Sequence, residues 1–265
     1  DAQIMPFQNL ELHPAISALH YGQSIFEGLK AYKTVNGDPV VFRPEENWLR
    51  INRSAIRMAM PEIPRELFME GMDELIKLDE SWIPEAEGSS LYIRPFMFAT
   101  DEYVGIKPSE NYKFIIFTCP VNAYYSEPVK VLIEENYARA VRGGTGAAKV
   151  AGNYAASLYP ALLAQKRGFR QLIWTDALEH KYLEESGTMN IFVQIGDQVI
   201  TPTLDQDTIL HGITRKSIIQ LMQDKGIKVE ERRIEVEEVL DAHEAGTLHD
   251  MFGAGTAATI AHISE

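Results

Sequence analysis

The hydrophobic pattern along the chain predicts helices and strands in both halves. Residues 46–59 repeat apolar side chains at helical spacing, with arginines on a neighbouring face, and this predicts an amphipathic helix. The short apolar and aromatic run at 112–121 is typical of a buried strand. Residues 129–137 resume a strand pattern after a polar stretch that contains Pro128. We place the connection between two domains in that polar stretch, at residues 122–128.

The second half alternates more regularly than the first. Residues 191–201 carry apolar side chains at every second position on both sides of a Gly-Asp pair, which is a strong hairpin signal. Residues 213–226 predict an amphipathic helix, with Thr214 as its N-cap and Gly226 as its C-cap.

The end of the chain predicts one more strand and one more helix. Residues 227–234 have the pattern of a strand, and residues 236–246 have that of a short helix whose acidic start we expect to be solvated. Taken with the polar connection, this order predicts a smaller α/β domain at 1–121 and a larger domain at 129–265.

Composition and charge narrow the classes of function. Of the 265 residues, 45% are hydrophobic and 24% are charged, which is usual for a globular protein. The formal net charge of −13 argues against a nucleic-acid backbone or an anionic membrane as the main partner. Cys119 is the only cysteine, which excludes an intrachain disulfide and a cysteine-built metal site, and we expect no metal.

The N-terminus carries no targeting signal that we recognise. It lacks the basic and apolar regions of a signal peptide, and the chain has no run of 18 apolar residues. We therefore expect a cytoplasmic protein. An organellar form stays open, because the chain opens without Met and a trimmed N-terminus fits that.

One lysine is surrounded by small residues. In residues 142–157, eleven of the sixteen are Gly, Ala, Ser or Thr, and Lys149 is the only lysine. In one interpretation this lysine extends its ammonium group to water and the glycines only form a turn. In the other, the small residues leave room for a flat ligand, and a partly desolvated amine condenses with an aldehyde. The second interpretation suggests pyridoxal phosphate, which also needs an anion site, an acid for its ring nitrogen and a donor to its phenolic oxygen.

Each of these three requirements has a candidate. Gly212 directly precedes a predicted helix, whose N-terminal N–H groups favour an anion, and residues 251–259 form a second Gly-rich turn. Glu184 and Glu185 lie at the edge of the predicted hairpin, where most glutamates are exposed but one could face a pyridinium. Tyr154 follows the lysine by five residues and could reach the phenolic oxygen.

Seven motifs occur in order along nearly the whole chain, from about residue 6 to residue 260. They are HYGQSIFEGLKAY, FRPEENWLRINRSA, LYIRPF, GGTGAAKVAGNYAASL, LEESGTMNIF, ILHGITRKS and GAGTAA. In these motifs the chain resembles the branched-chain amino-acid aminotransferases, which are fold-type IV pyridoxal-phosphate enzymes. The resemblance implies a two-domain α/β fold (α+β in some schemes) similar to that of D-amino-acid aminotransferase, with the cofactor on the larger C-terminal domain. It also implies at least a homodimer, and against the family the chain lacks an N-terminal segment and a C-terminal tail.

The implied reaction is transamination of leucine, isoleucine or valine with 2-oxoglutarate, a ping-pong cycle through a Schiff base on Lys149. The expected partners are thus small amino acids and 2-oxo acids. The resemblance also implies the residues of the site. For pyridoxal 5′-phosphate they are Arg50, Lys149, Tyr154, Glu185, Ile213, Thr214 and Thr256. For the substrate they are Tyr21, Phe26, Tyr92, Arg94 and Tyr124, with backbone groups of Thr256 and Ala257.

At some positions the residues alone support the resemblance weakly or depart from the pattern of the family. On the residues alone, the aromatic side chains of the substrate set are more often core. Some animal members of the family carry a Cys-x-x-Cys pair where this chain has Ala258 and Ala261, so a thiol switch of that kind is excluded. Pro160 falls inside the helix expected after Tyr154, which implies a kink or a late start of that helix.

Alternatives remain inside and outside the family. A D-amino-acid aminotransferase or an aminodeoxychorismate lyase would keep Lys149 and Glu185 with a different pocket, and a non-catalytic pyridoxal-phosphate-binding protein would keep the cofactor site. The motifs YIRP and GTMNIF favour the branched-chain enzymes. A phosphate-binding α/β oxidoreductase would need a G-x-G-x-x-G turn after a strand, which the chain lacks. The sequence does not rank leucine, isoleucine and valine, since they differ by a methylene or its position.

Overall fold

The chain divides into two compact units in a computed structural model that describes residues 2–122 and 127–264. The first unit is Asp1–Ala123 with Ala148–Gly152, and the second is Tyr124–Ala147 with Asn153–Glu265. The connection predicted at 122–128 falls mostly on residues 123–126, which lie outside the described residues. A short segment around the lysine of the small-residue stretch thus belongs to the first unit, although it follows the connection in sequence.

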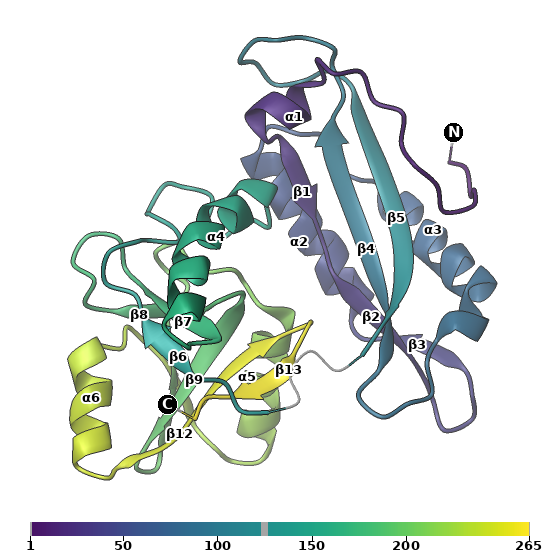
Figure 1. The fold of residues 1–265 in the computed structure, drawn as a ribbon. Coiled ribbons are helices and arrows are strands. Elements are labelled where there is room, and N and C mark those ends of the chain that lie inside the picture. Colours follow the sequence, from purple (N-terminus) through teal and green to yellow (C-terminus); the bar gives the residue numbers. More distant parts are fainter. Residues whose placement is uncertain (1, 123–126, 265) are drawn as a thin grey trace. The chain divides into compact units, whose positions relative to one another are not determined.

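The first unit is an antiparallel sheet with two helices, α2 and α3, on one face (Figure 1). The long strand β4 pairs with β5 on one side and with both β1 and β2 on the other, and β3 extends the sheet beyond β2. The elements are α1 (Ser17–Tyr21), β1 (Ser24–Phe26), β2 (Leu29–Lys33), β3 (Pro39–Val41), α2 (Pro44–Arg57), α3 (Arg65–Leu78), the 3₁₀ turn η1 (Glu80–Trp82), β4 (Ser90–Ala99) and β5 (Tyr112–Val121).

Two predictions for this unit are confirmed, and one detail differs. The helix predicted at 46–59 is α2, which buries Ile51 and Ala55 against the sheet and leaves Arg53 and Arg57 exposed. The strand predicted at 112–121 is β5. It is only partly buried along its length, because it is paired on one side alone, with β4.

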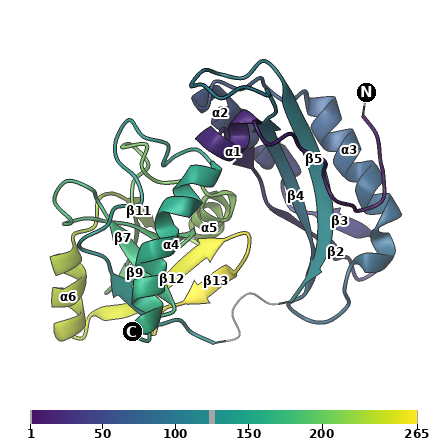
Figure 2. The same cartoon turned by 45° about the horizontal axis from the view of Figure 1, so that its top comes forward.

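The second unit is built on a mixed sheet in the order β11-β10-β9-β8-β7-β6, with β12 and β13 joined through β9. Helix α4 packs on β7 through Ala164, Leu172 and Trp174, and α5 and α6 contact β12 (Figure 2). The elements are β6 (Val131–Ile133), α4 (Ala151–Lys166), β7 (Gln171–Thr175), β8 (Leu183–Ser186), β9 (Met189–Ile195), β10 (Gln198–Thr201), α5 (Ile213–Asp224), β11 (Val229–Glu231), α6 (Val236–Glu244), β12 (Leu248–Gly255) and β13 (Thr259–His262).

The predicted hairpin, strands and helices of this half are present, with differences at their ends. The hairpin at 191–201 is the pair β9–β10, whereas the strands predicted at 129–137 and 227–234 are only three residues long as β6 and β11. The helix predicted at 236–246 is α6, with acidic residues in its first turn. Among the helices that the structure describes, none has the length and apolar composition to cross a membrane.

Both predicted caps of α5 are wrong, and of the two expectations for α4, a kink or a late start, the late start is wrong. The N-cap of α5 is Gly212 rather than Thr214, which already lies inside the helix. The C-cap is Lys225, and Gly226 follows it with a positive φ of 75°, the backbone region that glycine adopts most easily. Helix α4 begins at Ala151 and contains Pro160, so it does not start late. Proline lacks an N–H, so this turn of α4 is missing one backbone hydrogen bond.

Strand β8 places a glutamate in the core of the second unit. All four of its residues are buried. Burial raises the pKa of Glu184 to about 7, and the nearby Glu185 and Asp176 act in the same direction. The hydroxyl of Thr208, which donates to Oε1 of Glu184 at 2.6 Å, opposes the shift only in part.

This carboxyl should make the stability of the protein depend on pH. Its folded-state pKa lies above the unfolded value, so its contribution is fully present below pH 4.5 and is lost as the pH rises to about 7. Glu184→Gln removes the titrating group and keeps an acceptor for Thr208. Between pH 4.5 and 7 the free energy of unfolding should fall by up to about 3 kcal/mol more in the wild type than in the variant, measured by chemical denaturation. The same pH dependence in both proteins would contradict the burial of this group.

Candidate functional site

The backbone of Lys149 is fixed on both sides within the first unit. Its N–H donates to Oγ of Ser54 at 2.9 Å, and its carbonyl accepts from the N–H of Phe26 at 3.1 Å. The next residue, Val150, forms an isolated antiparallel bridge with Ile25 of β1. The lysine therefore starts from a rigid piece of sheet edge rather than from a free loop.

The side chain of Lys149 joins three of the predicted substrate residues. Its Nζ lies 4.9 Å from the centre of the Phe26 ring, and the guanidinium of Arg94 lies 4.7 Å from the same ring. Nη2 of Arg94 donates to the hydroxyl of Tyr92 at 2.9 Å, as expected for side chains two residues apart on one face of a strand. Among the residues that the structure describes, the buried Nε of Arg94 has no hydrogen-bond partner. Four groups thus lie together at β1 and β4: an amine, two aromatic rings and a guanidinium whose Nε–H can still donate.

The other predicted substrate residues of this unit are less closely joined. Tyr21 is at the end of α1 and 40% exposed, and Tyr124 lies outside the described residues. The ring of Tyr92 lies against Gly28, where a methyl group would overlap the tyrosine hydroxyl. Glycine at this position is therefore what lets the phenol lie flat over the backbone.

Arg50 lies in the same unit and is held by a buried carboxylate. Its Nε and Nη2 donate to the two oxygens of Glu27 at 2.7 and 2.8 Å, and Asn47 adds a third bond at 2.7 Å. Burial alone would raise the pKa of Glu27, but Arg50, Lys149 and Asn47 together hold it below its ordinary value. The guanidinium carries five N–H donors, of which this pairing uses two. Arg50 is thus locked in one orientation.

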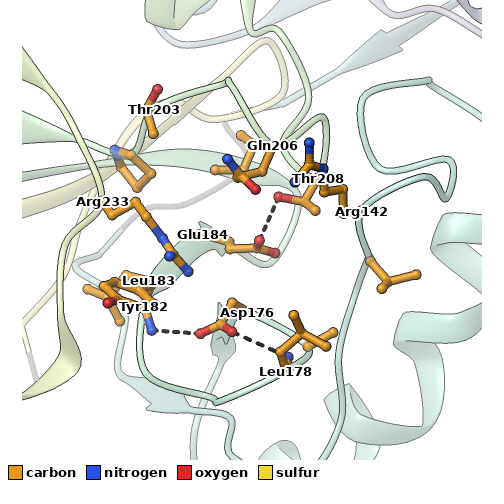
Figure 3. A pocket seen from close by; sticks show the side chains of 14 residues that line it. Arg142, Asp176, Leu178, Tyr182, Leu183, Glu184, Thr203, Gln206, Thr208 and Arg233 are labelled. Carbon is orange, nitrogen blue, oxygen red and sulfur yellow. Dashed lines mark hydrogen bonds between the residues drawn. The ribbon is translucent and has the colours of Figure 1, made fainter.

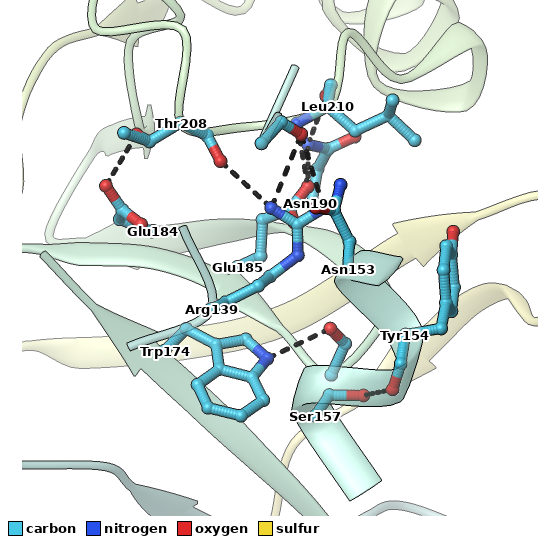
Figure 4. Close-up of polar contacts among 12 residues, drawn as sticks. Arg139, Asn153, Tyr154, Ser157, Trp174, Glu184, Glu185, Asn190, Thr208 and Leu210 are labelled. Carbon is cyan, nitrogen blue, oxygen red and sulfur yellow. Dashed lines mark hydrogen bonds and ion pairs between the residues drawn. The ribbon is translucent and has the colours of Figure 1, made fainter. Parts of the chain in front are cut away.

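In the second unit, Glu185 is the centre of a buried polar cluster (Figure 4). Nε of Arg139 lies 2.7 Å from its Oε2, and both side chains are less than a tenth exposed. Oε1 accepts from the N–H of Leu210 at 3.1 Å and from the amide of Asn190 at 3.3 Å. Arg139 also donates to the carbonyl of Thr208 at 2.9 Å. A cation and two neutral donors therefore surround this carboxylate, which favours its ionised form.

The same cluster fixes the start of helix α5. The amide of Asn190, which donates to Glu185, also donates to the carbonyl of Leu210 at 3.0 Å. Gly212 packs so closely on Asn190 that a methyl group there would overlap its side-chain oxygen. Within residues 2–122 and 127–264, no side chain caps the helix, so the first N–H groups, at Ile213 and Thr214, point to a place that suits an anion, which the helix dipole also favours.

The remaining predicted cofactor residues belong to this unit too. Tyr154 is in the first turn of α4 and half-buried, next to Asn153 (Figure 4). Asn153 and Thr145 bond to each other at 2.6 and 2.8 Å, which closes the small-residue loop ahead of the helix. Thr256 and Ala257 form the turn between β12 and β13, and both are partly buried.

Three residues of these clusters were missed by the sequence analysis. Glu27 carries no distinctive signal, because it lies between two short strands among small, charged and apolar residues. Arg139 and Asn190 carry no such signal, because an arginine in a polar loop and an asparagine beside a hairpin turn are common. The expectation that glutamates at this hairpin edge are exposed does not hold for Glu184 and Glu185, which are 7% and 2% exposed.

Comparison with known proteins gives consistent results. Residues 24–260 match the amino-transferase class IV family. A probable branched-chain-amino-acid aminotransferase of Staphylococcus epidermidis is 51% identical over 99% of this chain, and branched-chain-amino-acid aminotransferase 2 of Bacillus subtilis is 47% identical over all of it. The chain spans 74% of the length of each of these relatives. The T.th. branched-chain amino acid aminotransferase, solved with N-(5′-phosphopyridoxyl)-L-glutamate, superposes with a TM-score of 0.79 at 27% identity, covering 96% of this chain and 79% of that one.

These matches confirm the family and the fold class that the seven motifs predict. The match extends through both units and includes the segments that carry Lys149, Glu185 and the start of α5. The chain belongs to the class IV aminotransferases, within the family of the branched-chain-amino-acid aminotransferases.

Proposed function

We propose that the protein transfers the amino group of leucine, isoleucine or valine to 2-oxoglutarate with pyridoxal 5′-phosphate as cofactor and Lys149 as the essential amine. The observation that carries this proposal is the cluster of Lys149, Phe26, Tyr92 and Arg94, which offers an amine, apolar rings and a carboxylate receptor. The names of the relatives support the substrate class, and the phosphopyridoxyl compound bound to the T.th. enzyme supports the cofactor.

The residues present fit this cofactor. Gly212, which leaves no room for a side chain, and the uncapped N–H groups of Ile213 and Thr214 suit a phosphate. Arg50 and Thr256 are proposed to complete the phosphate site, Tyr154 to meet the phenolic oxygen and Glu185 the ring nitrogen. When bound, pyridoxal phosphate supplies an aldehyde that takes up the amino group and a ring that accepts electrons.

Lys149 is proposed to act as the base as well as the attachment point. Its Nζ takes the proton from the α-carbon of the amino acid and later returns a proton, so the amine must be neutral when it acts. The backbone bonds of Lys149 to Ser54 and Phe26 hold the Cα of the residue in place, and the four methylene groups of its side chain allow Nζ to turn. A side chain with a fixed Cα and a flexible end suits a group that accepts a proton at one atom and returns it to another.

Glu185 is proposed to keep a proton on the ring nitrogen. Its negative charge stabilises that proton, and Arg139 with the N–H of Leu210 stabilises the negative charge in turn. The carboxylate is less than a tenth exposed, so water screens its charge little. Arg139 therefore acts through Glu185 rather than on the substrate.

The two substrates are proposed to share one pocket. Phe26 and Tyr21 suit the branched apolar side chain of leucine, isoleucine or valine. Arg94 and Tyr92 suit the side-chain carboxylate of glutamate, since the Nε of Arg94 needs an acceptor. Tyr124, with the backbone of Thr256 and Ala257, is proposed to join the substrate site. A homodimer stays a prediction of the family resemblance.

Removing the amine tests the proposal as a whole. Lys149→Ala should lower the turnover of leucine with 2-oxoglutarate by roughly 10²–10⁴-fold or more. After borohydride treatment of the wild type, mass spectrometry should find the cofactor on the peptide that contains Lys149. Lys166→Ala, at an exposed lysine in the last turn of α4, is the matched control and should keep full turnover. Near-normal turnover of Lys149→Ala would refute the proposal.

Two variants separate the effect of the Arg139–Glu185 pair on stability from its effect on turnover. Arg139→Met leaves Glu185 without its cation and should lower the free energy of unfolding by about 3–5 kcal/mol. Adding Glu185→Gln removes the uncompensated charge and should restore most of that stability but not the turnover. Denaturation curves and leucine turnover of both single variants and the double variant give the two answers. Turnover that recovers along with stability would show that the pair only supports the fold.

The carboxylate receptor is tested by separate half-reactions. Arg94→Met keeps the length of the side chain and removes the guanidinium, so kcat/KM for glutamate and 2-oxoglutarate should fall about tenfold to a hundredfold more than for leucine and its oxo acid. The colour change of the cofactor follows each half-reaction independently. Arg53→Met, on the exposed face of α2, is the control. Equal losses for both substrate pairs would mean that Arg94 only supports the shape of the pocket.

A further inference from the structure

A second pocket lies wholly within the described part of the second unit, and the proposed reaction does not use it (Figure 3). It is partly open and is lined by β8, by the loop that follows β7, and by residues that precede α4, follow β10 and follow β11. The space open to the centres of water molecules is about 70 Å³, several times what a single water needs. The pocket can therefore hold a small organic molecule.

An unsatisfied carboxyl oxygen lies in this pocket. Glu184 is 7% exposed, and its Oε1 accepts from Thr208 at 2.6 Å. Its Oε2 is buried and has no hydrogen-bond partner among the residues that the structure describes. Buried polar atoms nearly always have a partner, so this oxygen points to a missing group in the pocket. Glu184 lines this pocket, whereas Glu185, Arg139 and Asn190 of the carboxylate cluster do not.

The charged residues of the pocket favour an anion. Arg142 and Arg233 both line it, and in Figure 3 the side chain of Arg233 runs toward Glu184. The guanidinium of Arg233 lies 3.4 Å from the centre of the Tyr182 ring, so it is held in place by stacking. Asp176 is the other acid in the lining, but its carboxylate already accepts four backbone N–H groups from its own loop, at 2.8–3.3 Å.

The rest of the lining is largely apolar. Side chains of Val141, Leu178, Pro202 and Ile209 face the same space as the two arginines. An inorganic anion would leave these surfaces without a contact. A ligand with a short aliphatic body and one carboxylate would meet both kinds of surface.

We propose that this pocket binds a small aliphatic monocarboxylate, with one carboxylate oxygen accepting the proton of Glu184 and the other facing the guanidinium of Arg233. The apolar residues contact the aliphatic body, and branched chains of four to six carbons have the appropriate size. The site is separate from the proposed catalytic residues, so the proposal does not depend on their roles.

Binding of this kind takes up a proton. Only the neutral form of Glu184 donates, and burial places its pKa at about 7, so half of the sites are ready at that pH. The charged or titratable groups around it are Glu185 on its own strand, Asp176 after β7, Arg139 and Arg142 before α4, Tyr182 before β8 and Arg233 after β11. Affinity should accordingly fall about tenfold from pH 6 to pH 8, as the neutral fraction does.

Isothermal titration of the holoenzyme with isovalerate tests the site, with cofactor absorbance recorded in parallel to report binding at the catalytic centre. We expect a binding event that leaves the absorbance unchanged and takes up protons from the buffer. Arg233→Met should weaken this event about tenfold or more. Arg57→Met, an exposed arginine of the first unit, should not change it. Glu184→Gln should keep the event, since an amide also donates, but should abolish proton uptake and pH dependence.

Two isosteric probes decide the chemistry of the ligand. Isovaleramide has the same shape without the charge, and 3-methylbutylamine carries the opposite charge. Neither should bind at the pocket if Glu184 donates to a carboxylate. Binding of the amine in place of isovalerate would overturn the proposal, because it would make Glu184 an ionised acceptor. Isovalerate binding that is seen only through the absorbance, or that is unaffected by Arg233→Met, would overturn it as well.

Discussion

The second unit depends on keeping one buried carboxylate charged. Taking Glu185 out of water is costly, and the fold offsets that cost with a cation and two neutral donors from three different segments. Arg139 comes from the loop after β6, Asn190 from β9 and Leu210 from the segment ahead of α5. Because these partners are fixed on the carboxylate, the start of α5 is fixed as well. The hydrogen bonds to the Glu185 carboxylate thus determine where the N-terminus of α5 lies relative to this side chain.

Two adjacent buried glutamates have different polar surroundings. Glu185 is surrounded by donors that favour the ionised form, while Glu184 has a single hydroxyl and is left closer to neutrality. Glu184 lines the pocket and Glu185 does not. Thr208 still links them, because its hydroxyl donates to Glu184 and its carbonyl accepts from Arg139, the partner of Glu185. All four residues of β8 are buried, and such a strand would ordinarily hold only apolar residues.

The local pattern of hydrophobic and polar residues predicts much of the fold but less of the candidate site. The helix 46–59, the strand 112–121 and the hairpin at 191–201 follow from periodicity, because their burial is one-sided or their turn is specific. The N-cap of α5 does not, because Gly212 packs closely on Asn190, a residue that precedes it by 22 positions in the sequence. Glu27 and Arg139 were missed for the same reason: each gains its importance from a partner that only the folded chain brings near.

The position of Lys149 in the chain has a consequence for folding during synthesis. Residues 148–152 belong to the first unit, where Val150 bridges Ile25 and Lys149 bonds to Ser54 and Phe26. The ribosome makes these residues only after it has begun the second unit. Nascent domains generally fold as they emerge. Here the segment that carries Lys149 is synthesised after residues 1–123, so the amine is the last part of the first unit to leave the ribosome.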